Sequence, residues 1–162
     1  MQFAFFETAL RAQKSYSRLM EPVCKRWNLT HNELDVLLFL ANNPQFHTAR
    51  DVVALRGFSK TYVSKAVDIV RGRGMSKGHV SLSLRSLEDR GLVACRADGS
   101  DRRAVHLALT DGAGEIAEDG RAVQQEFIRR LRDGITPEES AVILSVTRKM
   151  GDNIRAMERE RG

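Results

Sequence analysis

A pattern of seventeen residues occurs twice in succession in this 162-residue chain, and it constrains the fold more than any other feature. Residues 51–67 and residues 68–84 are identical at 8 of 17 aligned positions, which is unusual for a chance match. Each copy starts as a short helix, passes through a glycine-containing turn and a serine that can cap a helix, and continues as a second helix. The sequence therefore predicts a helix-turn-helix unit that occurs as a tandem repeat of two copies.

Two short strand-like runs follow the second copy, at residues 92–95 and 105–109. Asp98 and Gly99, which lie between them, are typical of a hairpin turn, and nearby arginines make the tip of the hairpin basic. A helix-turn-helix that is followed at once by such a hairpin predicts a winged helix. The expected fold class is mainly α (α+β), with a two-stranded β-hairpin as the wing.

Long amphipathic helices are expected on both sides of the winged helix. Residues 2–27, residues 111–132 and the segment that begins at Pro137 carry apolar side chains at three- and four-residue spacing. Thr30 and Glu33 form a capping-box pattern, which predicts where the next helix after the first begins. The apolar stripes of the terminal helices are wider than a winged-helix lobe can cover, so we expect them to pair between two chains.

The expected helices and the winged helix define two regions within a single domain. We expect one domain, 1–162, with dimerisation helices at 1–28 and 111–162 and a winged helix-turn-helix lobe at 29–110.

The net charge of +5 is concentrated in the middle of the chain. Residues 48–110 hold 12 Lys and Arg against 6 Asp and Glu, whereas both ends are nearly neutral. A basic patch of this kind attracts phosphate groups or an anionic membrane surface. Because no apolar run approaches the roughly 20 residues of a membrane span, we expect no membrane-spanning segment.

Nothing in the sequence predicts catalysis. Nucleophile-elbow, phosphate-loop and paired-carboxylate motifs are missing, and the four histidines and two cysteines do not have the spacing of metal ligands. We therefore expect no enzyme activity, no catalytic residues, no metal and no cofactor. The low cysteine count and the lack of a signal peptide at the start predict a cytoplasmic protein.

Short motifs in a fixed order resemble those of MarR-type bacterial transcription regulators. They are LT-x-x-E-x-x-x-L at 29–37, TARDVV at 48–53, SKGHVS at 76–81, LEDRGLV at 87–93, DRR at 101–103 and LT at 109–110. The resemblance covers nearly the whole chain. It implies a homodimeric winged-helix regulator, in our interpretation a repressor, that binds double-stranded DNA at a pseudo-palindromic operator. It also implies release from DNA by a small, frequently aromatic ligand or by oxidation.

The chain departs from this family in one respect, because the tandem copy adds about 17 residues to a helix-turn-helix that the family has once. Only the second copy is in frame with the wing, so we place the reading helix at about 76–90. The predicted DNA-contacting residues of that helix are Ser76, Lys77, Gly78, His79, Ser81 and Arg85. If the first copy reads DNA instead, the corresponding residues are Ser59, Lys60, Thr61, Tyr62, Ser64 and Lys65.

The wing is expected to contribute four further residues. Arg103 at the hairpin tip can enter the narrow minor groove, and Asp101 can orient it. Arg96 and Arg102 are expected to contact phosphates. In the reading helix, Ser76 and the first-turn N–H groups suit phosphate contact, whereas His79, Ser81 and Arg85 can reach base edges.

Two alternatives stay open. The first is a redox-responsive regulator of the same fold, although burial is the expected fate of both Cys24 and Cys95. The second is a winged-helix protein-interaction module that does not bind DNA and uses the repeat helix for contact.

Overall fold

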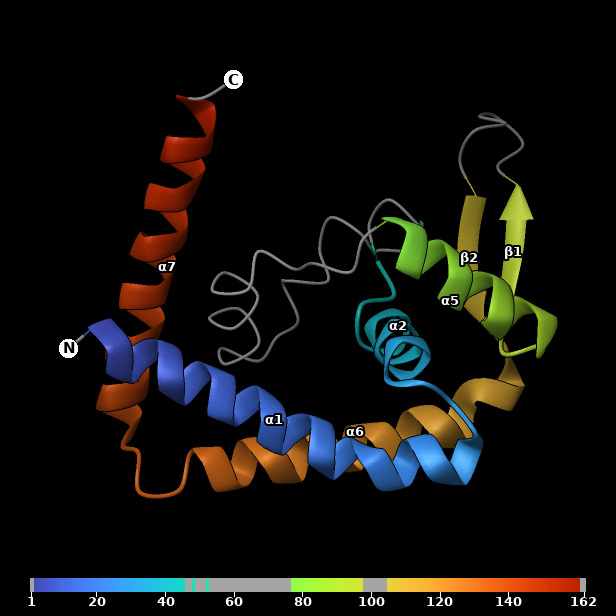
Figure 1. The fold of residues 1–162 in the computed structure, drawn as a ribbon, viewed down its shortest axis with the longest axis horizontal. Helices are drawn as coiled ribbons and strands as arrows, with labels where there is room; N and C mark the ends of the chain where they lie inside the picture. The colour runs from blue at the N-terminus through green and yellow to red at the C-terminus, as the bar shows by residue number, and fades with distance from the viewer. Residues whose placement is uncertain (1, 46–47, 49–51, 53–76, 98–104, 161–162) are drawn as a thin grey trace. The chain divides into compact units, whose positions relative to one another are not determined.

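A computed structural model describes residues 2–45, 48, 52, 77–97 and 105–160, and the following account is confined to them. The described elements are α1 (Gln2–Trp27), α2 (His31–Asn42), α5 (Lys77–Asp89), β1 (Val93–Ala97), β2 (Val105–Leu109), a 3₁₀ turn (Asp111–Ala113), α6 (Gly114–Leu131) and α7 (Pro137–Arg159), shown in Figure 1. They form two compact units, Met1–Phe127 and Ile128–Gly162. The first unit contains every described element up to most of α6, and the second contains α7.

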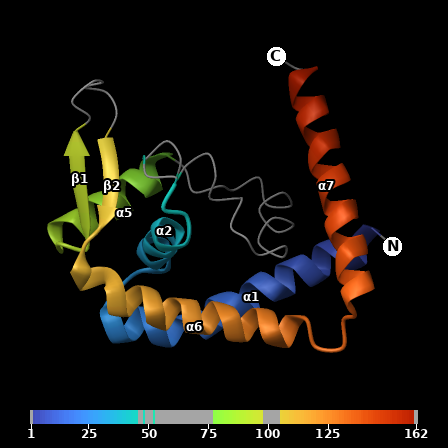
Figure 2. The ribbon, with the colours of Figure 1, turned by 180° about the vertical axis from the view of Figure 1, so that it is seen from behind.

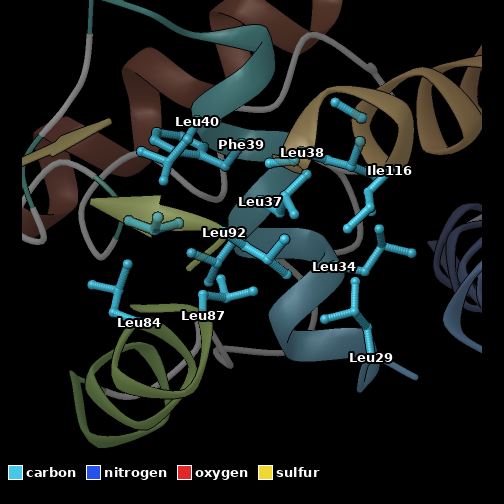
Figure 3. Close-up of a cluster of buried hydrophobic side chains, with 14 of the residues drawn as sticks. Leu29, Leu34, Leu37, Leu38, Phe39, Leu40, Leu84, Leu87, Leu92 and Ile116 are labelled. Atoms are coloured by element: carbon cyan, nitrogen blue, oxygen red, sulfur yellow. The ribbon is translucent and has the colours of Figure 1, made fainter. Parts of the chain in front are cut away.

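α2 is the central helix of the first unit. Its capping box is formed as predicted, because Glu33 N donates to Thr30 Oγ1 (3.2 Å) while Thr30 N donates to Glu33 Oε2 (2.6 Å). Five consecutive side chains from Val36 to Leu40 are each no more than 6% exposed. A helix that is apolar on all sides must be covered on all sides. Figure 3 shows leucines of α2 surrounded by Leu84 and Leu87 from α5, Leu92 and Ile116.

α1 and the first part of α6 run side by side below α2, as both Figure 1 and Figure 2 show. Their contact is fixed by polar bonds as well as by packing. Trp27 Nε1 donates to Asp119 Oδ2 (2.8 Å), and the ring of Tyr16 meets that of Phe127 edge to face with centroids 5.4 Å apart. Gln124 Nε2 donates to Tyr16 Oη (3.0 Å), which adds a second bond between the two helices.

The end of α2 is tied to α6 by a further set of bonds. Asn42 Nδ2 donates to Gln124 Oε1 (2.9 Å), and Arg121 Nε donates to Asn42 Oδ1 (2.9 Å). Arg121 also donates a short bond to the carbonyl of Ala41, one of the last carbonyls of the helix, which have no partner within it. Gly120 lets the two helices approach closely, since a Cβ there would lie 2.7 Å from Cδ2 of Leu38.

The two strands form the predicted antiparallel hairpin. Val93 pairs with Leu109, Cys95 with Leu107 and Ala97 with Val105. Gly91, which ends α5 with a φ of +67°, occupies the left-handed region that glycine adopts most easily. The side chain of Thr110 does not cap the following 3₁₀ turn, because its hydroxyl instead donates to the carbonyl of Gly91 (2.7 Å).

α7 is described by itself as the second unit. Thr136 and Glu139 form a second capping box at its start, and Pro137 is its first residue, as the sequence predicts. The large apolar side chains of α7 that are exposed are those of Val142, Ile143, Val146, Met150 and Met157.

Within the described ranges, every helix is too short or too polar to cross a membrane. The predicted wing tip, the first repeat copy except Val52, and Ser76 lie outside the residues that the structure describes.

Candidate nucleic-acid interface

α5 separates into a buried face and an exposed face. The buried side chains recur at three- and four-residue spacing and are Val80, Ser83, Leu84 and Leu87. The remaining positions of the first turns face outward, and they are Gly78, His79, Ser81, Leu82 and Arg85. Apart from Leu82, which is 65% exposed, this outward surface consists of glycine and of side chains that can donate hydrogen bonds.

The C-terminal half of α5 is held in place by two anchors. Ser86 Oγ donates a short hydrogen bond to Oε1 of Glu33 at the start of α2. Arg90 donates from Nη1 to the carbonyl of Asn28 (2.8 Å) and from Nη2 to the carbonyl of Trp27 (2.7 Å). These bonds fix the rotation of α5 about its axis, so the same side chains always face outward.

Glu33 is a charged anchor although only 8% of it is exposed. Burial by itself raises the pKa of this carboxyl, but hydrogen bonds from Ser86 and Thr30 and the charge of Arg90 outweigh burial, and the pKa lies below the ordinary 4.5. The ionised form is therefore the one that holds α5 at neutral pH.

The described strands of the wing carry one predicted residue, Arg96. Arg96 lies on β1, is exposed, and pairs in register with His106 on β2. Thr48 forms an isolated antiparallel bridge with His106, which connects the segment after α2 to the hairpin. The tip residues Asp101, Arg102 and Arg103 lie outside the described residues.

The structure thus describes part of the predicted set. Gly78, His79, Ser81 and Arg85 are exposed on α5, and Arg96 is exposed on the strand that follows. For Lys77, the first residue of α5, only the backbone is described. The alternative set in the first copy lies outside the described residues, so the choice between the two copies stays a prediction. Its members are Ser59, Lys60, Thr61, Tyr62, Ser64 and Lys65.

Sequence reasoning missed two features of this surface. It assigned Glu33 to a capping box only, and nothing in the local pattern relates it to Ser86, which is 53 residues away. It also passed over Leu82, although helical spacing places Leu82 on the side opposite Val80 and Leu84.

A pocket of about 420 Å³ lies between the end of α2, strand β2 and the start of α6. This volume is in the range that holds small molecules in proteins. Its lining surface is divided almost evenly between polar and apolar atoms, and the charged residues in it are Glu118 and Arg121. The pocket therefore combines an apolar surface with a guanidinium group.

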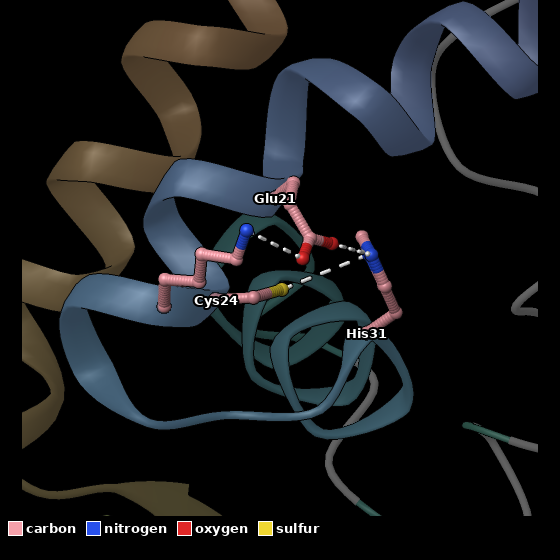
Figure 4. Close-up of polar contacts among 4 residues, drawn as sticks. Glu21, Cys24 and His31 are labelled. Atoms are coloured by element: carbon pink, nitrogen blue, oxygen red, sulfur yellow. Dashed lines mark hydrogen bonds and ion pairs between the residues drawn. The ribbon is translucent and has the colours of Figure 1, made fainter.

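Cys24 and Glu21 of α1 both lie against His31 at the start of α2 (Figure 4). Cys24 Sγ is 3.6 Å from Nδ1 of His31, whose Nε2 is 2.9 Å from Oε2 of Glu21. Burial, followed by the negative charges of Glu21 and Asp35, raises the pKa of the Cys24 thiol. The neutral thiol dominates at pH 7, so these three residues do not supply an activated thiolate. Burial of Cys24 is as predicted, whereas Cys95 is partly exposed, with a pKa also raised by burial.

These elements define a winged-helix protein: a helix anchored with a polar face outward, followed directly by a two-stranded hairpin. A sequence model of the MarR family matches residues 27–69. No curated protein matches the chain in sequence. The matched segment, 43 of the 162 residues, includes α2 and is similar in sequence to that family.

Several solved structures are similar to this chain in fold. A MarR-family regulator from Silicibacter pomeroyi has a TM-score of 0.66 at 19% identity, over 89% of this chain and 85% of that one. MepR of S. aureus in complex with DNA has a TM-score of 0.64 at 18% identity, over 90% and 91%. BpsR of Bordetella bronchiseptica, whose DNA binding is regulated by 6-hydroxynicotinic acid, has a TM-score of 0.60 at 22% identity, over 93% and 99%.

Proposed function

We propose that this chain is a sequence-specific repressor that binds double-stranded DNA as a homodimer in the bacterial cytoplasm. The observation that carries the proposal is the outward face of α5, where Ser81 and Arg85 are exposed on a helix that is fixed to α2 by Glu33. Arginine recognises guanine in the major groove, and serine can bond to several base edges. A fixed helix presents them in one register.

The remaining contacts in the proposal come from the same surface and from the wing. Ser76, Lys77 and the first-turn N–H groups of α5 bind phosphates, and His79 reaches a base edge. Arg96 and Arg102 bind phosphates, while Arg103, oriented by Asp101, enters the minor groove. In this arrangement the second repeat copy reads DNA and residues 29–110 form the DNA-binding lobe.

The homodimer is supported by the apolar face of α7. Val142, Val146 and Met150 recur at four-residue spacing and are 62%, 49% and 38% exposed. A stripe of this kind is covered most economically by a second copy of the chain. We therefore assign residues 1–28 and 111–162 to dimerisation, which separates the two reading helices by about one turn of DNA and requires a pseudo-palindromic operator.

A small amphipathic anion is the proposed inducer, and the pocket supports it. Leu40, Leu107 and Leu109 supply apolar walls for a ring or chain, and Arg121 can pair with a carboxylate. Arg121 already bonds to the end of α2, so a ligand that draws the guanidinium away alters how α2, and with it α5, is held. The regulation of BpsR by 6-hydroxynicotinic acid, an aromatic acid, agrees with this chemistry.

The raised pKa of Cys24 and of Cys95 favours this ligand-responsive form over the redox-responsive alternative. The other alternative, a protein-interaction module, differs in its response to salt, because only a protein that contacts several phosphates loses affinity steeply as salt rises.

A matched pair of arginine variants tests the proposal. A duplex is first selected from a random-sequence pool by the wild-type protein, and affinities are then measured by fluorescence anisotropy. Arg85→Ala should lose about 1–3 kcal/mol of binding free energy and relax the preference at one base pair. Arg148→Ala, which removes an exposed arginine from α7, should bind as tightly as the wild type. Equal affinity of the wild type and Arg85→Ala would refute the assigned reading face.

A further inference from the structure

Leu82 is the one exposed aliphatic side chain among the described residues of α5. It is 65% exposed, whereas Val80, Leu84 and Leu87 of the same helix are at most 6% exposed. Exposure of a single leucine is common on protein surfaces and needs no special explanation by itself. Its position is what matters, because Leu82 follows Ser81 and lies one helical turn from both Gly78 and Arg85 on the outward face.

The chemistry of the major groove offers one apolar group to such a side chain. Guanine, cytosine and adenine present hydrogen-bond donors and acceptors there, and thymine adds its 5-methyl group. A leucine that met only donors and acceptors would remove them from water without giving any bond in return. A leucine against the thymine methyl buries apolar surface on both sides.

The neighbours of Leu82 leave room for this contact. Gly78, one turn before it, has no side chain that could hold the helix away from the base edges. Ser81 and Arg85 offer polar atoms on either side. The Ser86 anchor lies on the same helix and the Arg90 anchor directly after its end, and together they limit its rotation, so Leu82 keeps its outward direction.

We propose that Leu82 determines specificity by packing on the 5-methyl group of a thymine in each operator half-site. The inference rests on the proposed function, because it requires that α5 enters the major groove. Leu82 is thereby added to the residues that recognise bases, although it forms no hydrogen bond to them. The operator should then contain an invariant thymine within a few base pairs of the guanine that Arg85 recognises.

Deoxyuridine differs from thymidine only by the missing methyl group, and this gives a direct test. Each thymine of the selected duplex is replaced in turn by deoxyuridine, and the affinities of the wild type and Leu82→Ala are measured by anisotropy. At one thymine per half-site the wild type should bind about fourfold more weakly, which corresponds to about 0.8 kcal/mol for one methyl group. Replacement in both half-sites should weaken binding about 15-fold.

Leu82→Ala should bind the thymine duplex more weakly than the wild type does and should respond less than twofold to the same replacement. The proposal is overturned if no thymine shows the wild-type penalty, or if Leu82→Ala shows the same penalty as the wild type. If the wild type selects no duplex from the pool, the proposed DNA-binding function is refuted together with the role of Leu82. If it selects a duplex but no deoxyuridine replacement weakens binding, only the role of Leu82 is refuted.

Thermal unfolding separates readout from packing. Leu82→Ala should keep the melting temperature of the wild type, whereas Leu84→Ala, a matched change on the buried face, should lower it by several degrees. An equal fall in both variants would show that Leu82 is covered by protein, and this would also overturn the proposal.

Discussion

The bond between Glu33 and Ser86 should stabilise the fold more than an ordinary capping box, and Glu33→Ala tests this. The variant removes the acceptor for Thr30 N and Thr30 Oγ1 as well as for Ser86 Oγ. Loss of a cap costs about 1 kcal/mol, and a hydrogen bond to a charged group contributes about 1.5–3 kcal/mol. We therefore expect the free energy of unfolding to fall by about 2–4 kcal/mol.

The assay is urea unfolding followed by circular dichroism, with Glu139→Ala as the matched control. Glu139 occupies the same place in the capping box of α7 but is exposed. That control should lose only about 0.5–1 kcal/mol. A double-mutant cycle of Glu33→Ala with Ser86→Ala then isolates the bond between α2 and α5, for which we expect a coupling of about 1–2 kcal/mol. A coupling near zero would refute the anchoring of α5.

The same bond predicts a pH dependence. The pKa of Glu33 is lower in the folded chain than the ordinary 4.5, so its ionised form stabilises the fold above that value. This contribution is lost as the pH falls below 4.5 and through the lower folded pKa. Glu33→Gln, which keeps a capping side chain at the position, should be less sensitive than the wild type to acid in this window. Identical acid unfolding curves for the wild type and Glu33→Gln would contradict the ionised state that we assign to Glu33.

Two further predictions concern packing and thiol reactivity. Gly120→Ala should lower the free energy of unfolding by about 1–3 kcal/mol, because the added Cβ meets Leu38, whereas Gly114→Ala, where nothing lies within 4 Å, should not destabilise the chain in the same urea assay. Cys24, whose pKa is raised, should react with a thiol reagent at pH 7 more slowly than a free cysteine does, and the more exposed Cys95 should react faster than Cys24. Rapid modification of Cys24 would restore the redox-responsive alternative.

The sequence predicts the elements well where the signal is local. The start of α2 follows from Thr30 and Glu33, the start of α7 from Pro137, and the wing from two short strand-like runs on either side of Asp98 and Gly99. Each of these signals lies within one short segment of the chain. The bond from the Thr110 hydroxyl to the carbonyl of Gly91, 19 residues away, is formed only by the fold.

The anchors of the candidate interface are not predictable in this way. Glu33 and Ser86 are 53 residues apart, Arg90 and Asn28 are 62 apart, and neither pair has a pattern that marks it. Leu82 is a different case, since helical spacing alone places it opposite the buried residues. Because leucine is apolar, the sequence alone suggests that Leu82 is buried. Only the fold shows that the opposite face of α5, with Val80 and Leu84, is the one that packs against the core.

The measurement that tests the central claim most directly is the affinity of the wild-type protein for its selected duplex across a salt series, beside a duplex of scrambled sequence. We predict a steep linear fall of log affinity with log salt, and a preference for the selected duplex that persists at every salt concentration. Equal affinity for both duplexes, or an affinity that does not change with salt, would contradict sequence-specific DNA binding by this chain.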